Sequence, residues 1–154
     1  MADAIEILRE DLSQTLSFID KCDDHMFKVK NWALVTTSAV IAFAIARDRD
    51  YLPLANIAFC FAFIYLELMY KSFQDSAIDH SRELSKRIDS YLAGSEKKEI
   101  LDGYKHGFGR TLEYPSLMRV FSLLGDRHRW HILTFYLLLS GFSIGAILIA
   151  EYVA

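Results

Sequence analysis

The stretch WALVTTSAVIAFAIARDRDYLPLANIAFCFAFIYL, residues 32–66, decides the fold of this chain. Two uncharged, strongly apolar runs, residues 32–46 and 51–66, flank the charged tetrapeptide RDRD. A membrane-spanning helix needs about 20 apolar residues, with about 17 as a lower limit. The first run reaches that length if Lys28 and Lys30 extend their amines to the membrane surface. The tip between the runs is short enough to force two helices into an antiparallel hairpin.

A third uncharged run, residues 132–150, is long enough to span a membrane by itself. Hydrophobic residues make up 53% of the 154-residue chain, yet charged residues still make up 24%. This composition fits a chain with separate apolar and charged blocks. The sequence therefore predicts an all-α protein with three membrane-spanning helices, at residues 32–46, 51–70 and 132–150. A soluble helical bundle is the alternative.

The first two spans are predicted to continue as long helices outside the membrane. No Gly or Pro occurs between Ala2 and Leu52, and none occurs after Pro53 until Gly94, so nothing interrupts either helix. Apolar or small residues recur in steps of three and four, the pattern of helices that pack against each other as a stalk. In the first helix, predicted over residues 3–46, these positions are Ile5, Leu8, Leu12, Thr15, Ile19, Cys22, Met26 and Val29. In the second helix they are Leu66, Tyr70, Phe73, Ala77, His80, Leu84, Ile88 and Tyr91.

Lysine and arginine residues predict the orientation of the chain, because cytoplasmic segments carry an excess of them. Residues 71–131 contain eleven, the N-terminal arm four, the RDRD tip two and the C-terminal EYVA none. The acidic N-terminus does not have the composition of a secretory signal or a transit peptide. We therefore expect a cytoplasmic helix at residues 1–30, a transmembrane hairpin at 31–70, a cytoplasmic helical stalk and basic segment at 71–130, and a third span at 131–154.

The segment before the third span, GYKHGFGRTLEYPSLMRVFSLLGDRHRW (residues 103–130), mixes cations with aromatic rings. Cations bind phosphates and flat rings stack on bases, so this composition suits a nucleotide or a short oligonucleotide. The alternative is a topological anchor, which explains the cations next to the span without any ligand. The predicted ligand-binding residues are Lys105, His106, Arg110, Arg127 and Arg129, with Tyr104 or Phe108 stacking on a base.

Polar side chains within the first two spans are candidates to line a path for ions. Glu67 is the most costly of them in a membrane, where a carboxylate must face water, a partner or the interface. Because Glu67 lies near the cytoplasmic end of its span, exposure at the interface is the simpler interpretation. The predicted path-lining residues are Thr37, Ser38, Asn56 and Glu67.

The third span carries a GxxxG motif at Gly141 and Gly145. Small residues at this spacing let two helix backbones approach closely, so the motif predicts helix packing through this face. Together with the stalk, it predicts the association of several copies into a homo-oligomer.

Signals of catalysis or metal binding are few. The sequence GFG at residues 107–109 lacks the further glycines and the lysine of a phosphate-cradling loop. His128 and His131 lie three residues apart, but no Cys, Asp or Glu completes a metal-ligand spacing with them. Cys22 and Cys60 fall in different segments and imply no disulfide, so we expect both to be packing residues. We therefore expect neither an enzyme nor a cofactor or metal site.

Residues 31–92, two spans joined by a charged tip and continued as a long cytoplasmic helix, resemble the small SLATT-type transmembrane effectors of bacterial anti-phage defence. The third span and the basic segment before it are more similar to the Hailong-type channel effectors. The resemblance implies a pore in the bacterial inner membrane, with the N-terminus and middle region cytoplasmic and the C-terminus periplasmic. It also implies control by a nucleotide or short DNA oligomer that a partner nucleotidyltransferase makes.

These observations lead to one functional hypothesis and one alternative. The hypothesis is a homo-oligomeric ion channel in the lipid bilayer, for example a tetramer, that binds an anionic nucleotide ligand on its cytoplasmic side. The alternative is a non-conducting membrane scaffold whose stalk recruits a cytoplasmic partner.

Overall fold

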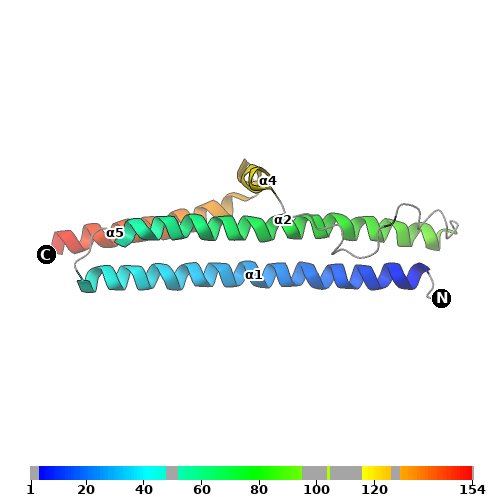
Figure 1. Ribbon diagram of the computed structural model, residues 1–154, viewed down its shortest axis with the longest axis horizontal. Coiled ribbons are helices and arrows are strands. Elements are labelled where there is room, and N and C mark those ends of the chain that lie inside the picture. Colours follow the sequence, from blue (N-terminus) through cyan, green and yellow to red (C-terminus); the bar gives the residue numbers. More distant parts are fainter. Residues whose placement is uncertain (1–3, 48–51, 95–103, 105–115, 126–128, 154) are drawn as a thin grey trace. The chain divides into compact units, whose positions relative to one another are not determined.

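The described part of the chain is helical, which confirms the predicted all-α class for these residues. The structure, a computed structural model, describes residues 4–47, 52–94, 104, 116–125 and 129–153. The first helix covers 44 residues, close to the predicted range, whereas residues 48–50 of the charged tip lie outside the described part. The elements are α1 (Ala4–Arg47), α2 (Leu52–Leu92), α4 (Leu117–Ser122), the 3-10 helix η2 (Leu123–Gly125) and α5 (Trp130–Val153) (Figure 1).

The ends of α2 follow from its sequence. Pro53 stands in the first turn, where its missing N–H costs no helical hydrogen bond. Gly94, just beyond the other end, has a φ of 97°, a left-handed conformation that residues with a Cβ rarely adopt. The Gly94 N–H donates to the Tyr91 carbonyl over 3.1 Å, so a terminal carbonyl is satisfied where the helix stops. The predicted stop at Gly94 is confirmed.

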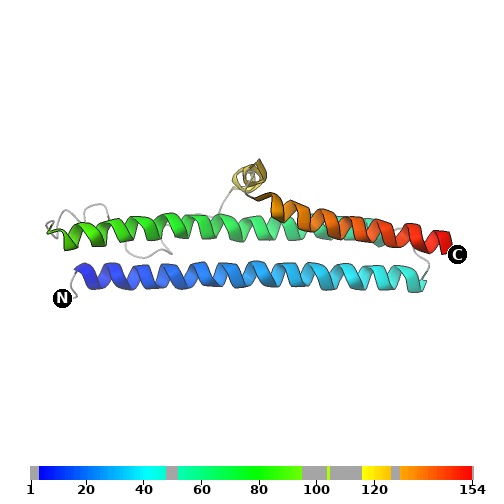
Figure 2. The same cartoon turned by 180° about the vertical axis from the view of Figure 1, so that it is seen from behind.

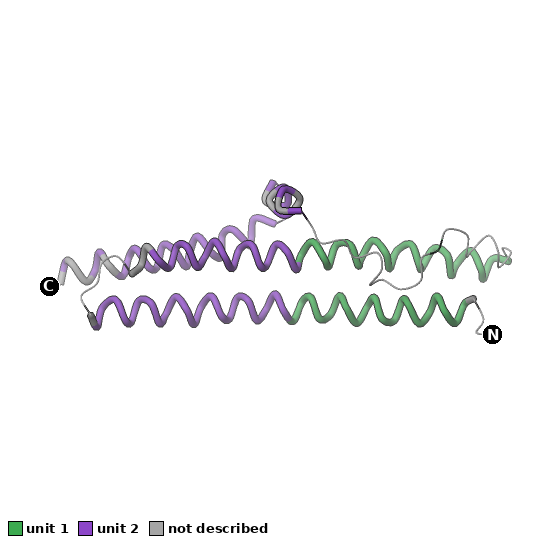
Figure 3. Tube along the Cα trace, in the orientation of Figure 1, with its two compact units in different colours: residues 1–24, 71–115 green, residues 25–70, 116–154 purple. Residues whose placement is uncertain are grey.

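The chain divides into two compact units (Figure 3). Unit 1 contains residues 1–24 and 71–115, and unit 2 contains residues 25–70 and 116–154. Within each unit α1 and α2 lie side by side in antiparallel order, as the short charged tip predicts (Figures 1 and 2). Contacting pairs include Asp11 with His80 and Asp23 with Gln74 in unit 1, and Lys30 with Glu67 and Thr37 with Asn56 in unit 2.

In unit 1, α1 and α2 pack through the predicted stripe, the apolar and small residues that recur in steps of three and four. Leu8, Thr15 and Cys22, seven residues apart on α1, are buried, and so are Ala77 and Leu84 on α2. Complete burial of a leucine side chain contributes roughly 1.5–3 kcal/mol. Leu8 and Leu84 form the centre of an apolar cluster, against which pack Leu12, Ile88, Tyr91 and Tyr104.

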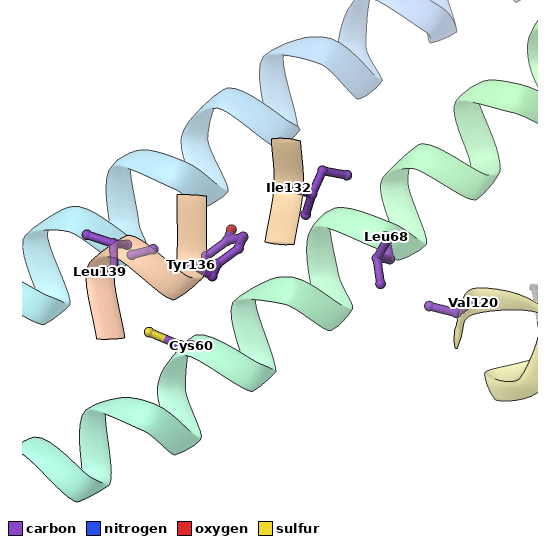
Figure 4. Close-up of a cluster of buried hydrophobic side chains, with 7 residues drawn as sticks. Cys60, Leu68, Val120, Ile132, Tyr136 and Leu139 are labelled. Carbon is purple, nitrogen blue, oxygen red and sulfur yellow. The ribbon is translucent and has the colours of Figure 1, made fainter. Parts of the chain in front are cut away.

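Unit 2 packs its helices around a larger apolar cluster (Figure 4). Ile132, Tyr136 and Leu139 follow each other in steps of four and three on α5, which places them on one face of that helix. Val120 of the short helix α4 lies beside Leu68 of α2 in Figure 4, so α4 adds cover to the cluster. The buried members of the cluster are Ala33, Cys60, Leu68, Val120, Ile132, Tyr136 and Leu139.

One described helix is compatible with membrane insertion. Residues Ile5–Ala46 contain a window long and apolar enough to cross a membrane, and 17% of that window is buried. The core helix of a soluble protein would be mostly buried, so this exposure is compatible with lipid around the window. Residues Trp130–Ala146 form a shorter apolar helix. Exposed large apolar side chains of unit 2 include Val35, Phe43, Ile45, Phe61, Leu137, Leu138, Phe142 and Leu148.

Cys22 and Cys60 are free and buried, which confirms that they are packing residues. Burial is the main reason that the pKa of the Cys22 thiol rises from its ordinary 9.0 to about 11, and the nearby Asp23 carboxylate adds to the rise. The folded protein therefore holds this proton more tightly than the unfolded chain does. The corresponding stabilisation is complete below about pH 9 and is lost as the pH rises through about 11.

We expect Cys22 to react slowly with iodoacetamide, because the thiolate is the reactive form. The raised pKa leaves roughly 100-fold less thiolate at pH 8 than an ordinary cysteine has, and burial slows the reaction further. Mass spectrometry of the detergent-solubilised protein measures the rate, with an SDS-unfolded sample as the control. Equal labelling rates in the two samples would contradict the buried position.

Candidate functional site

Unit 2 holds a carboxylate inside its apolar core. Glu67 of α2 is 1% exposed. The Lys30 Nζ atom of α1 lies 3.0 Å from Glu67 Oε1, and the Tyr136 hydroxyl of α5 donates to Glu67 Oε2 over 3.0 Å. The expected exposure of Glu67 at the interface is therefore wrong, because an amine and a phenol compensate its charge within the core. We call Lys30, Glu67 and Tyr136 the ionic layer.

A second polar set joins the same three helices. The Thr37 hydroxyl donates to Asn56 Oδ1 over 3.1 Å, and Asn56 Nδ2 donates to Ser143 Oγ over 2.7 Å. The Ser143 hydroxyl donates in turn to the Leu139 carbonyl over 3.2 Å. Each of the three polar side chains is buried, and pairing them avoids the cost of unsatisfied polar groups in apolar surroundings. We call Thr37, Asn56 and Ser143 the amide layer.

The ionic and amide layers are one heptad apart on two of the helices. Thr37 follows Lys30 by seven residues on α1, and Ser143 follows Tyr136 by seven residues on α5. Each of these helices therefore presents both of its polar side chains on one face. A shift of α5 along α1 would break both layers together, so the two layers set the register of α5 against the hairpin.

The predicted path-lining residues have different surroundings. Thr37, Asn56 and Glu67 are buried in the two layers, with partners from the same chain, whereas Ser38 is exposed on α1. The layers bring together residues that are far apart in the sequence, and they leave Ser38 outside. That these side chains line a path for ions stays a prediction.

The predicted packing motif lies on an open face of α5. Gly141 is exposed and Gly145 is half-buried. A Cβ atom built at either glycine would meet nothing within 4 Å. Within one chain, therefore, these glycines are not required by close contact with another helix.

Unit 1 contains a second buried carboxylate. Asp11 of α1 is 6% exposed, and its Oδ2 atom lies 3.1 Å from His80 Nε2 and accepts a 2.5 Å hydrogen bond from the Tyr104 hydroxyl. The Arg87 guanidinium lies over the Tyr104 ring, 5.8 Å from its centroid, within cation–π range. Burial, then the hydrogen bond to Asp11, raises the pKa of Tyr104, so the phenol keeps its proton and donates it. We call Asp11, His80 and Tyr104 the tyrosine clasp.

Most of the predicted ligand-binding residues lie outside the described part of the chain. Of the two that are described, Tyr104 belongs to unit 1 and Arg129, which is half-buried, belongs to unit 2. Their role in ligand binding stays a prediction. The predicted residues outside the described part are Lys105, His106, Phe108, Arg110 and Arg127.

Sequence reasoning did not single out Tyr136, Ser143 or Asp11 as site residues. The sequence does contain a signal for Tyr136 and Ser143, because their hydroxyl groups are seven residues apart within a span that has few other polar side chains. Asp11 stands next to the stripe position Leu12, where a carboxylate is unexpected. The burial of these side chains was not predictable without the partners that contact them.

The ionic layer predicts a specific pattern of stability changes. Lys30→Met should cost about 2 kcal/mol, less than the 3–5 kcal/mol typical of breaking a fully buried pair, because the Lys30 side chain is 33% exposed. Adding Glu67→Gln should recover part of the loss, since it removes the charge that lacks a partner. Lys21→Met, the same change at an exposed position of α1, should stay within about 0.5 kcal/mol of the parent.

Thermal unfolding of the detergent-solubilised variants, followed by circular dichroism, measures these differences. Equal losses for the two lysine substitutions, or additive losses for Lys30→Met and Glu67→Gln, would contradict the ionic layer.

The ionic layer and the tyrosine clasp can each hold helices in place, because each contains a buried carboxylate that requires its partners. Loss of either partner leaves a buried carboxylate uncompensated, so the arrangement responds to whatever competes for those partners. In the described part of the chain, no group of three or more His, Cys, Asp or Glu residues is placed to hold a metal ion, and His128 lies outside it. Comparison with protein-family models, with curated proteins and with solved structures finds no match to this chain.

Proposed function

We propose that this chain is the subunit of a homo-oligomeric ion channel in the bacterial inner membrane, controlled by an anionic nucleotide or short oligonucleotide on its cytoplasmic side. The observation that carries the proposal is the ionic layer, in which an acid, an amine and a phenol meet among apolar helices. Ionisable groups inside membrane helices are costly and rare, and they mark ion or proton pathways.

Three spans are part of this proposal. The exposed apolar side chains of unit 2, such as Phe43 on α1, Phe61 on α2 and Phe142 on α5, suit a lipid environment. The second span completes the hairpin, and the third span takes the chain across the membrane again. In this topology the N-terminus and residues 71–130 are cytoplasmic, and the C-terminus is periplasmic.

Several copies, for example four, form the channel in this proposal. The polar side chains of both layers contact each other within one chain, so an ion path forms between copies or after these side chains rearrange. The open face at Gly141 and Gly145 supports association, because a second helix can approach a backbone that lacks side chains.

Ligand control rests on the cations and rings of residues 103–130. Cations neutralise phosphates and release their counterions, whereas aromatic faces stack on bases. A nucleotidyltransferase that makes the ligand is the expected partner. The resemblance to anti-phage effectors supports this part of the proposal.

A membrane scaffold is the second candidate function, and one observation favours it. Glu67, Thr37 and Asn56 all have partners inside their own chain, which is the arrangement expected if they only hold the helices in register. A scaffold of this kind recruits a cytoplasmic partner through unit 1 and passes no ions.

The oligomer can be tested through the glycine face. Gly141→Leu combined with Gly145→Leu should reduce the mass of the detergent-solubilised particle, because larger side chains hold the backbones of two copies apart. A Cβ atom at either position meets no atom within 4 Å in a single chain, so we expect each protomer to keep its fold and its circular dichroism spectrum. Mass photometry measures the particle, and an unchanged mass would remove this face from the oligomer.

Ion conduction separates the channel from the scaffold. Purified protein in planar bilayers should pass current, with or without a short single-stranded DNA, and Glu67→Gln should reduce cation preference because it removes a negative charge. Glu6→Gln, the same substitution at an exposed position of α1, is the matched control and should leave selectivity unchanged. Absence of current under every ligand condition favours the scaffold.

A further inference from the structure

The sequence predicts that Tyr104 or Phe108 stacks on a base. Of these two residues, Tyr104 is held in the tyrosine clasp. Tyr104 is half-buried in unit 1, and its ring packs against the cluster centred on Leu8 and Leu84. The Arg87 guanidinium lies over the ring, while the hydroxyl is bonded to Asp11. In this position the Arg87 guanidinium occupies the place over the ring where a base would stack.

Asp11 makes the docking of Tyr104 more than a surface contact. The carboxylate is buried, and a buried carboxylate is stable only when donors satisfy it. Two donors from different parts of the chain converge on the same oxygen, His80 Nε2 at 3.1 Å and the Tyr104 hydroxyl at 2.5 Å. Hydrogen bonds to a charged acceptor are shorter and stronger than those between neutral groups, so removal of Tyr104 from the clasp has a definite cost.

We propose that the tyrosine clasp is an autoinhibitory contact, in which Asp11 and His80 hold Tyr104 in a docked position that a nucleotide ligand must displace before the ring can stack on a base. The inference rests on the proposed function, because it requires a ligand that competes for Tyr104. It differs from the sequence-based hypothesis, in which Tyr104 is an open binding surface. Here Tyr104 has two mutually exclusive sets of partners.

The clasp then sets the apparent affinity for the ligand. When the binding-competent state is a minor fraction of the population, the apparent dissociation constant rises in inverse proportion to that fraction. Weakening the clasp should therefore tighten ligand binding, provided that the aromatic ring is kept. An ordinary ligand-contacting residue behaves in the opposite way, because changes to it weaken binding or leave it unaltered.

Tyr104→Phe tests this inference directly, since it removes the hydroxyl that Asp11 accepts and keeps the stacking face. With the full-length protein in detergent and a fluorescein-labelled hexanucleotide of deoxythymidine as the probe, we expect about tenfold tighter binding, the order of magnitude of one hydrogen bond to a charged acceptor. Tyr70→Phe is the matched control, because the Tyr70 ring stacks on His25 in unit 2 at a centroid distance of 5.1 Å. It should leave the affinity unchanged.

Nitration by tetranitromethane, which attacks the phenolate of tyrosine, tests docking without any ligand. Burial and the bond to Asp11 raise the pKa of Tyr104, so we expect slow nitration in the parent protein and faster nitration in Asp11→Asn. Tyr152, which is 92% exposed, is the internal control and should be nitrated at the same rate in both proteins. Peptide mapping by mass spectrometry separates the two sites.

The outcomes distinguish the inference from the proposed function. Tighter binding by Tyr104→Phe, together with slow nitration of Tyr104 in the parent, supports the autoinhibitory contact. If the parent binds the probe and Tyr104→Phe binds it equally well or more weakly, the inference is overturned while the proposed function stands. If neither the parent nor Tyr104→Phe binds the probe even at low salt, both are overturned.

Discussion

Burial of the Glu67 carboxylate is the constraint on which the arrangement of unit 2 depends. An ionised carboxylate in apolar surroundings needs a cation and hydrogen-bond donors within contact distance. Lys30 and Tyr136 supply them from two other helices. Once these partners are in place, α5 cannot slide or rotate against α1 and α2 without leaving the charge uncompensated. The amide layer and the apolar cluster then pack around helices whose register is already set.

Unit 1 meets the same constraint with different chemistry. Asp11 is buried between two helices whose pairing rests on the apolar stripe, and it accepts from His80 and from Tyr104. Tyr104 lies beyond the end of α2, so the carboxylate ties a residue outside the long helices to the helical pair. The hydrogen bond from the Tyr104 hydroxyl can break while the apolar packing of Leu8 and Leu84 persists. Because the hydrogen bond and the helix packing are separate, the contact is suitable for regulation.

The channel and scaffold proposals use the same buried polar groups in different ways. In a scaffold, the ionic and amide layers only align the helices, and their contacts within the chain do not change. In a channel, the same pairing belongs to one state, and the ionic layer keeps charged groups available to a path that forms between copies. Buried ion pairs stabilise a protein only weakly relative to apolar packing. Specifying the register of the helices is one reason for such a pair, and switching or ion passage is the role that we propose for Glu67.

The sequence by itself determined that the long segments are helical, and it identified core positions of α1 and α2 in unit 1. The freedom from Gly and Pro predicts α1, Gly94 marks the end of α2, and steps of three and four identify core positions such as Leu8 and Leu84. These features depend on neighbours along the chain, so a single sequence contains them. Only the tertiary structure decided that Glu67 is buried rather than exposed at an interface, and that Tyr104 already has partners. Their contacts come from residues 37 to 93 positions away, and the rotation of one helix against another, which creates them, is not encoded in local spacing.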